Sequence, residues 1–221
     1  MKTLDRATQP SRTDVTVALR EAYDLIAAEY AERNLGPASP DHRSWLARLW
    51  HCLPPRSVIV DVGCGPGRDG ACLSALGARV IGLDLSARML QIAATGQLER
   101  VAQADAFQLP LRQRSVDGVL MASLVLHVRR PDLVDVLTEA HRVLRPGGVV
   151  ALNTPLGGSE GWDLQPYDPI KHSYAVAARR WFVYRSEAEV RAAADETGFG
   201  LLWVERRQRY SQWLDVLLRC S

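Results

Sequence analysis

Apolar and polar positions along this chain alternate in blocks, and the blocks predict strands and helices in turn. Between residue 57 and about residue 155, short apolar runs of strand length are each followed by a helical pattern. The clearest runs are Val58–Val60, Arg79–Asp84 and Val119–Leu126, the last of which suits a buried central strand. This alternation predicts an α/β sheet whose ligand site lies at the carboxyl ends of its strands.

Two predicted helices precede this core, one over residues 13–34 and one over residues 42–53. The first carries an apolar face with spacings of three and four residues, formed by Leu19, Tyr23, Ile26 and Tyr30. We expect residues 1–55 to form an N-terminal helical extension and residues 56–221 to form the main domain.

An irregular segment interrupts the pattern after the predicted strand Val149–Asn153. It covers about residues 155–184, and a connection of that length within a compact domain is typical of functional or mobile loops. Ser186 and Glu189 then predict a capping box at the start of a helix that Gly198 ends. Two strands, at 201–206 and about 212–218, are expected to finish the chain.

The turn after the first strand is rich in glycine. Gly63, Gly65 and Gly67 stand between the apolar run and a helical pattern that begins near Ala71. Glycines at such a turn allow positive φ and let a ligand lie against the main chain, facing the positive end of the following helix. The segment therefore predicts a small-molecule pocket.

A dinucleotide is one ligand that this turn could hold, because Gly65–Gly70 matches the pattern G-x-G-x-x-G. The frame argues against it. The strand ends near Val62, so the turn begins at Gly63, and Arg68 then stands where the last glycine is needed. Asp61, just before the turn, would repel a pyrophosphate but can accept a hydrogen bond from an ammonium group.

Two further carboxylates follow the next two predicted strands. Asp84 can accept hydrogen bonds from both hydroxyls of a ribose. Asp105 can accept one from the exocyclic amine of an adenine, while Ala106 offers its backbone N–H to the ring. One carboxylate for an amino acid, one for a ribose and one for a base together describe S-adenosylmethionine.

Six motifs carry a resemblance to the class I S-adenosylmethionine-dependent methyltransferases, in the order and at the spacing of that family. They are Asp61-Val-Gly-Cys-Gly-Pro-Gly67, Gly82-Leu-Asp-Leu-Ser86, Ala104-Asp-Ala106, Leu109-Pro-Leu111, Ser115-Val-Asp-Gly118 and Val143-Leu-Arg-Pro-Gly-Gly148. The resemblance implies a Rossmann-like, mostly parallel sheet of seven strands with helices on both faces, the last strand antiparallel, and an N-terminal helical lid.

The resemblance also implies where the cofactor binds. Gly63, Gly65 and Gly67 would cradle its methionine part, Asp84 would hold the ribose, and Asp105 with Ala106 would hold the adenine. The expected cofactor-binding set is completed by Asp61, Cys64, Leu85 and Met89. We interpret Cys64 as a small space-filling residue of the turn rather than a nucleophile.

The methyl acceptor is expected to approach from the first helix, the end of the fourth strand and the 155–184 insert. The candidate catalytic residues are His127, as a general base, and Tyr23. The candidate acceptor-binding residues are Tyr30, Trp162, Arg180 and Trp181. In each case packing is the alternative interpretation. The family often carries one or two histidines at this point. Only the first is present here, since Val128 follows His127, which weakens the case for a paired base.

Composition narrows the class of protein. The chain is 47% hydrophobic and 24% charged, and its formal net charge of +2 is too small to indicate nucleic acid. Its four cysteines show neither a C-x-x-C pair nor zinc spacing, so we expect reduced thiols, no metal and a cytoplasmic location. The polar first residues do not resemble a signal peptide, and the longest apolar run is too short for a membrane.

A methyltransferase acting on a small molecule is the first functional hypothesis, with a homodimer as an expected assembly. A tRNA or protein acceptor is an alternative. A nicotinamide-dependent oxidoreductase is another, because Tyr167 and Lys171 mimic a Y-x-x-x-K dyad, although Pro169 opposes the helix that this dyad needs. A non-catalytic domain that binds the cofactor also remains open.

Overall fold

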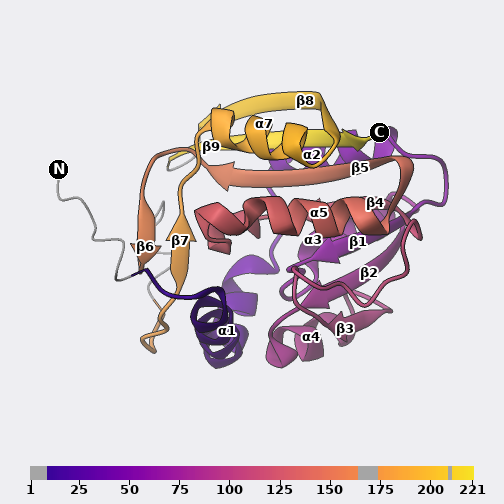
Figure 1. The fold of residues 1–221 in the computed structure, drawn as a ribbon. Helices are drawn as coiled ribbons and strands as arrows, with labels where there is room; N and C mark the ends of the chain where they lie inside the picture. Colours follow the sequence, from indigo (N-terminus) through magenta and orange to yellow (C-terminus); the bar gives the residue numbers. More distant parts are fainter. Residues whose placement is uncertain (1–8, 164–173, 209–210) are drawn as a thin grey trace.

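The computed structural model describes residues 9–163, 174–208 and 211–221. Its main sheet has seven strands in the order β3-β2-β1-β4-β5-β9-β8 (Figure 1). Strand β9 is antiparallel to both of its neighbours, whereas the pairs from β3 to β5 are parallel. The structure thus confirms the Rossmann-like sheet with an antiparallel last strand.

The elements of the described residues have the following bounds. The strands of the main sheet are β1 (Val58–Val62), β2 (Arg79–Asp84), β3 (Val101–Gln103), β4 (Val116–Met121), β5 (Leu144–Pro155), β8 (Phe199–Gln208) and β9 (Gln212–Cys220). A separate antiparallel pair consists of β6 (Glu160–Trp162) and β7 (Trp181–Val183). The helices are α1 (Arg12–Asn34), α2 (Pro40–His51), α3 (Arg68–Ala75), α4 (Ala87–Ala94), α5 (Leu133–Val143) and α7 (Glu187–Glu196), with short 3₁₀ turns η2 (Val125–His127) and η3 (Arg130–Asp132).

Two hydrophobic cores lie on the two faces of the sheet. One joins α5 and α7 to the sheet, through residues such as Leu137 and Val190. The other joins α2, α3 and α4 to the opposite face, through residues such as Leu49, Leu73 and Ala93. Helices therefore cover both faces, as predicted, and the strand ends are left as the place for a ligand.

The order of the strands reverses between β1 and β4. From β1 the chain builds outward to β2 and β3, and it then returns to place β4 on the other side of β1. In an open α/β sheet, ligands bind outside the carboxyl ends of the strands at such a reversal. The glycine turn follows β1, and Asp84 is the last residue of β2. Both features therefore lie close to this reversal.

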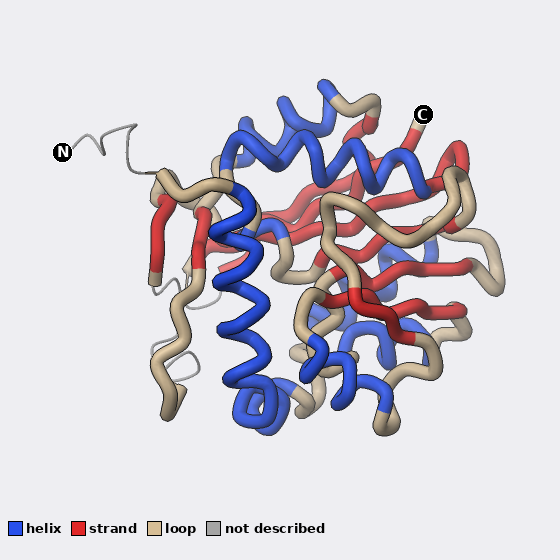
Figure 2. Tube along the Cα trace, turned by 60° about the horizontal axis from the view of Figure 1, so that its bottom comes forward, coloured by secondary structure: helices blue, strands red, loops and turns tan. Residues whose placement is uncertain are grey.

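Helix α1 lies beside the sheet rather than on either face. Figure 2 shows it as a long helix between the β6–β7 pair and the main body. Val15 and Leu19 of α1 pack with Trp181 and Val183 of β7. The position agrees with a lid, although the division of the chain at residue 55 stays a prediction.

Several predicted boundaries were wrong. The first helix, predicted over residues 13–34, begins earlier, because Ser11 is the N-cap of α1 and forms a capping box with Asp14. The predicted strand 119–126 ends at Met121, and the chain turns into η2 after Ser123, which takes a positive φ of 56°. The segment predicted to be irregular over about residues 155–184 contains β6 and β7, which pair with each other.

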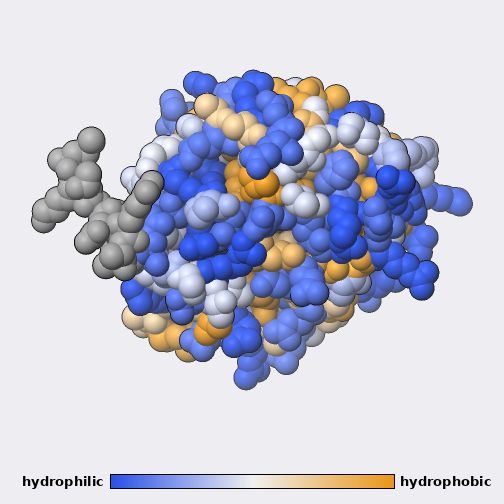
Figure 3. All heavy atoms as spheres, in the orientation of Figure 1, coloured by the Kyte–Doolittle hydropathy of each residue, from blue (hydrophilic) through white to orange (hydrophobic). Residues whose placement is uncertain are grey.

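Two other expectations concern what the chain does not contain. Within the described ranges, no helix is long and apolar enough to cross a membrane, and no cluster of side chains could hold a metal ion. Hydrophilic residues dominate the face seen in Figure 3, with small hydrophobic patches between them. Tyr167 and Lys171, the dyad of the oxidoreductase hypothesis, lie outside the described residues.

Candidate functional site

A cavity of about 670 Å³, open to solvent, lies at the carboxyl ends of β1, β2 and β4. One side is lined by Gly63, Gly65, Asp84, Leu85, Met89 and Ala106. The other side is closed by Tyr23 and Tyr30 of α1 and by His127. Nine of the residues predicted from the sequence are thus brought together.

The glycine turn forms the floor of this cavity. Gly63 and Gly65 have φ values of 72° and 53°, a left-handed conformation that strains other residues. A Cβ atom at Gly63 would also come within 2.9 Å of the Leu124 side chain. Gly67 does not line the cavity: it caps α3 and packs against Ala93 and Gln97 of the neighbouring helix end.

Asp84 is held in place by the backbone on both sides. Its two carboxylate oxygens accept hydrogen bonds from the N–H groups of Gly65 and Ser86, each at 2.8 Å. Burial raises the pKa of Asp84 to about 6, while these hydrogen bonds oppose the shift. The carboxylate oxygens retain lone pairs, so the group can accept further hydrogen bonds from a ligand in the cavity.

Asp61 lies beneath the turn rather than in the wall of the cavity. It is 1% exposed, and its Oδ2 has no hydrogen-bond partner in the structure. Burial, Asp69 and Asp84 all raise its pKa, against a hydrogen bond from the Gly70 backbone. An unsatisfied buried carboxylate costs free energy, and a cationic group placed nearby would offset that cost. Asp61 therefore fits the ammonium of an amino-acid moiety.

A smaller hollow continues the cavity past Leu85 and Ala106 toward Asp105. Asp105 Oδ1 accepts a hydrogen bond from the Phe107 N–H at 3.1 Å, which fixes the turn after β3. The guanidinium of Arg12 lies 4.3 Å from the centre of the Phe107 ring. Arg12 and Phe107 thus lie next to the predicted adenine position. Neither residue was predicted from the sequence.

Tyr23 and His127, which close one side of the cavity, form a hydrogen-bonded pair. The Tyr23 hydroxyl lies 2.6 Å from His127 Nε2, and His127 Nδ1 lies 2.6 Å from the carbonyl oxygen of Trp181. A carbonyl only accepts, so Nδ1 carries the proton and the Nε2 lone pair accepts from Tyr23. When His127 is neutral, these two contacts select the tautomer with its proton on Nδ1.

The predicted acceptor-binding residues of the insert lie behind this pair. Trp162 and Trp181 pack edge to face, with ring centroids 5.2 Å apart, and neither lines the cavity. Glu160 accepts hydrogen bonds from the Arg130 N–H and the Trp181 indole. The two tryptophans thus anchor the insert, which agrees with the packing alternative, while the main chain of Trp181 orients His127.

Cys64 is buried and also lies outside the cavity lining. A Cβ atom at Gly82 would come within 2.9 Å of its Sγ, so the thiol packs tightly against β2. This position agrees with a space-filling residue.

The lid helix is tied directly to the cavity through Asp24, a contact with no signal in the sequence. Asp24 Oδ1 accepts hydrogen bonds from the Ser86 hydroxyl at 2.7 Å and from the Arg88 N–H at 3.1 Å. Ser86 is also the N-cap of α4, as predicted, and its N–H donates to Asp84. Ser86 therefore links helix α1 to Asp84, the predicted ribose-binding carboxylate, through one hydrogen bond to each.

A glycine turn, carboxylates in or just after three parallel strands and a cavity at the strand reversal define a Rossmann-like protein with a small-molecule site. The family described as "Methyltransferase domain" matches residues 60–152. The ubiquinone/menaquinone biosynthesis C-methyltransferase UbiE of Rubrivivax gelatinosus is 31% identical, over 90% of this chain and 82% of its own length. The malonyl-[acyl-carrier protein] O-methyltransferase of Dechloromonas aromatica is 32% identical, over 96% of this chain and 76% of its own.

Solved structures agree with this fold. The 1,6-didemethyltoxoflavin-N1-methyltransferase of Burkholderia thailandensis, with bound 1,6-didemethyltoxoflavin and S-adenosylhomocysteine, superposes with a TM-score of 0.76. It is 21% identical in sequence, and the match covers 99% of this chain and 93% of the length of that protein. The chain belongs to the class I S-adenosylmethionine-dependent methyltransferases, and S-adenosylmethionine is its cofactor.

Proposed function

We propose that this enzyme transfers the methyl group of S-adenosylmethionine to a small-molecule acceptor by in-line displacement. The observation that carries the proposal is the placement of Tyr23 and His127 across the cavity from the glycine turn and Asp84. An acceptor between these two sides would meet the cofactor from the open side.

S-adenosylmethionine supplies a methyl group that its sulfonium already activates, so the main task of the protein is positioning. Asp84 accepts hydrogen bonds from the ribose hydroxyls, and Gly63 and Gly65 give the methionine part close access to the backbone. Asp61, beneath the glycine turn, would compensate the charge of the ammonium group from below the turn. Asp105 and Ala106 bind the adenine, with Leu85 and Met89 as apolar walls.

Tyr23 and His127 provide a route for a proton if the acceptor carries one. The acceptor would donate its proton to the Tyr23 oxygen while Tyr23 passes its own proton to His127 Nε2. Burial raises the pKa of Tyr23, so a lasting tyrosinate is unfavourable and the two transfers must occur together. The Trp181 carbonyl, already bonded to Nδ1, would stabilise the imidazolium that results.

The named activities of similar proteins support small acceptors without identifying one. One relative is named for ubiquinone/menaquinone biosynthesis and one solved structure for a toxoflavin precursor. Another relative is named for a malonyl group on a carrier protein, which keeps a protein-borne acceptor as an alternative. A cytoplasmic location and a homodimer also remain proposals.

The proposal is tested in two stages. Calorimetry should first detect saturable binding of S-adenosylmethionine and not of a nicotinamide cofactor. Release of S-adenosylhomocysteine should then follow addition of a panel of small molecules. Total tRNA and a protein extract serve as competing acceptors, and methylation of these alone would refute a small-molecule acceptor. Cofactor binding without turnover on any acceptor would favour a non-catalytic domain.

Cofactor affinity should depend on pH through Asp84. Its pKa of about 6 means that the carboxylate is ionised above that pH and protonated below it. The ionised form is the better acceptor for ribose hydroxyls, so affinity should be full at about pH 7 and fall by up to about tenfold per pH unit below about pH 6. Calorimetry from about pH 7 to about pH 5 measures this.

The control for this prediction is Asp84→Asn, which keeps the size of the side chain and has no proton to gain. It should bind the cofactor more weakly at every pH and with a flat profile in this window. A flat profile for the wild-type protein would remove Asp84 as the titrating group.

Asp24→Ala should loosen the lid. The substitution removes the acceptor for Ser86 and Arg88, and hydrogen bonds to a charged group are worth about 1.5–3 kcal/mol. We expect the dissociation rate of S-adenosylhomocysteine to rise about tenfold in stopped-flow measurements. Glu21→Ala, at an exposed position of the same helix, is the matched control. Equal rates in the two variants would show that Asp24 does not hold the lid.

A further inference from the structure

Arg180 is a buried cation beside the acceptor side of the cavity. It is 6% exposed, and it directly precedes β7. Its guanidinium carbon lies 5.0 Å from the ring centre of Tyr174, 5.2 Å from that of Phe182 and 5.9 Å from that of Tyr23. Three aromatic rings from separate segments therefore surround one positive charge.

Arg180 is also linked to the catalytic pair. A hydrogen bond and the charge of Arg180 both act to lower the pKa of Tyr23, against the effect of burial. The Tyr23 hydroxyl in turn contacts His127, whose ring centre lies 4.9 Å from that of Phe182. The guanidinium thus lies next to Tyr23, which lines the cavity, although Arg180 itself is not among the lining residues.

A guanidinium in this position favours an anionic acceptor over a cationic one. Aromatic rings around a methyl-transfer site can attract a cationic amine, but a fixed guanidinium beside them repels one at close range. An anion gains from the same charge, and more so where water is excluded. A guanidinium also offers a planar fork of N–H donors to a carboxylate or another anionic oxygen.

We propose that the acceptor is a planar anion, an aromatic or conjugated ring bearing a carboxylate or other negative oxygen that binds Arg180. The ring of the acceptor packs against Tyr23 in the cavity, and its anionic group reaches the guanidinium of Arg180 beside that ring. Arg180 is then a residue that determines specificity for the acceptor, and this assignment rests on the proposed small-molecule methyl transfer.

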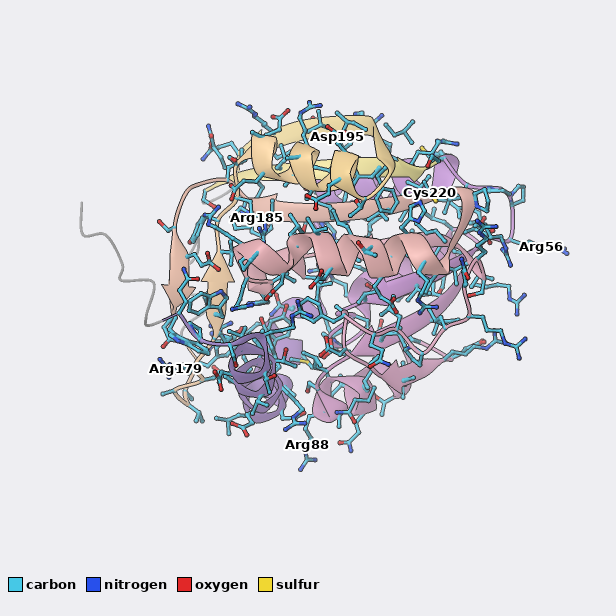
Figure 4. The ribbon with its side chains drawn as sticks, viewed as in Figure 1. Arg56, Arg88, Arg179, Arg185, Asp195 and Cys220 are labelled. Atoms are coloured by element: carbon cyan, nitrogen blue, oxygen red, sulfur yellow. The ribbon has the colours of Figure 1, made fainter. Side chains whose placement is uncertain are left out.

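The neighbouring Arg179 provides a matched control. It is exposed and its guanidinium lies 4.1 Å from the ring centre of Trp162. Figure 4 shows its label at the edge of the molecule, away from the main sheet. Arg179→Gln and Arg180→Gln therefore remove the same charge from adjacent positions, one outside the proposed acceptor site and one within it.

The experiment compares three probes that share a phenol ring: para-hydroxybenzoate, para-hydroxybenzamide and para-hydroxybenzylamine. They carry a negative charge, no charge and a positive charge opposite the hydroxyl. Binding of each to the full chain saturated with S-adenosylhomocysteine is measured by ligand-observed NMR titration. The wild-type protein should prefer the anion over the amide by about tenfold to a hundredfold, and should bind the cation most weakly.

Arg180→Gln should abolish the preference for the anion while Arg179→Gln retains it. The ratio of the two affinities is diagnostic, because a merely structural role of Arg180 would weaken all three probes alike. Equal binding of the three probes, a preference for the cation, or binding of none of them would overturn the inference. So would a preference that survives in Arg180→Gln.

Affinity for S-adenosylhomocysteine separates this outcome from failure of the proposed function. It is measured first for every variant and should change little in Arg180→Gln. A protein that binds the cofactor product but shows no preference for the anion loses only the assignment to Arg180. A protein that does not bind the cofactor product loses both proposals.

Discussion

Replacing Asp84 with alanine is expected to weaken S-adenosylmethionine binding about a hundredfold or more, the largest loss of affinity from any single change in the cavity. Two hydrogen bonds from ribose hydroxyls to a carboxylate would be lost, each worth about 1.5–3 kcal/mol. The N–H groups of Gly65 and Ser86 would also lose their acceptor, so the turn and the start of α4 would no longer be held together. Calorimetry with S-adenosylmethionine measures the effect.

The fold should survive this substitution. The raised pKa of Asp84 means that burial disfavours its ionised form in the folded protein, and alanine removes that cost. Thermal unfolding without ligand should therefore show little change, whereas the stabilisation that the ligand adds should largely disappear. Asp105→Ala is the comparison, because this carboxylate is only partly buried; we expect a loss of about tenfold. Unchanged affinity in Asp84→Ala would refute the ribose assignment.

The cofactor side of the site could be predicted because its chemistry is local in the sequence. Gly63 and Gly65 follow the strand that they end, and Asp84 closes the next strand, so hydrophobic periodicity places them at one edge of a parallel sheet. Gly67 shows the limit of this argument. It belongs to the same motif, yet its role in the structure is to pack α3 against the end of α4.

The acceptor side could be predicted only in part, because its contacts join residues far apart in the chain. Tyr23 and His127 were candidates, but their direct hydrogen bond joins positions 104 residues apart. Asp24 has no local signal, since only the packing of α1 brings it to Ser86. The β6 strand was missed because Glu160–Trp162 has too few residues for a periodic pattern, and pairing with β7 decides its conformation.

His127→Ala and Tyr23→Phe are each expected to lower kcat about a hundredfold with the acceptor that the screen identifies, if the methylated atom carries a proton. General acid–base catalysis contributes about 10²–10⁴-fold to such reactions. Affinity for S-adenosylmethionine should change little in Tyr23→Phe, because the ring stays and packs edge to face on Tyr30 as before.

The double variant distinguishes a proton relay from two separate contributions. If Tyr23 passes its proton to His127, removing both should cost little more than removing either, because groups that act as one unit are not additive. Tyr30→Phe is the matched control: Tyr30 lines the same cavity and contacts Tyr23, whereas His127 contacts Tyr23, Phe182 and Trp181. Full activity in Tyr23→Phe and His127→Ala would restore the interpretation of both residues as packing, whereas a double variant with fully additive losses would separate their roles and exclude the relay.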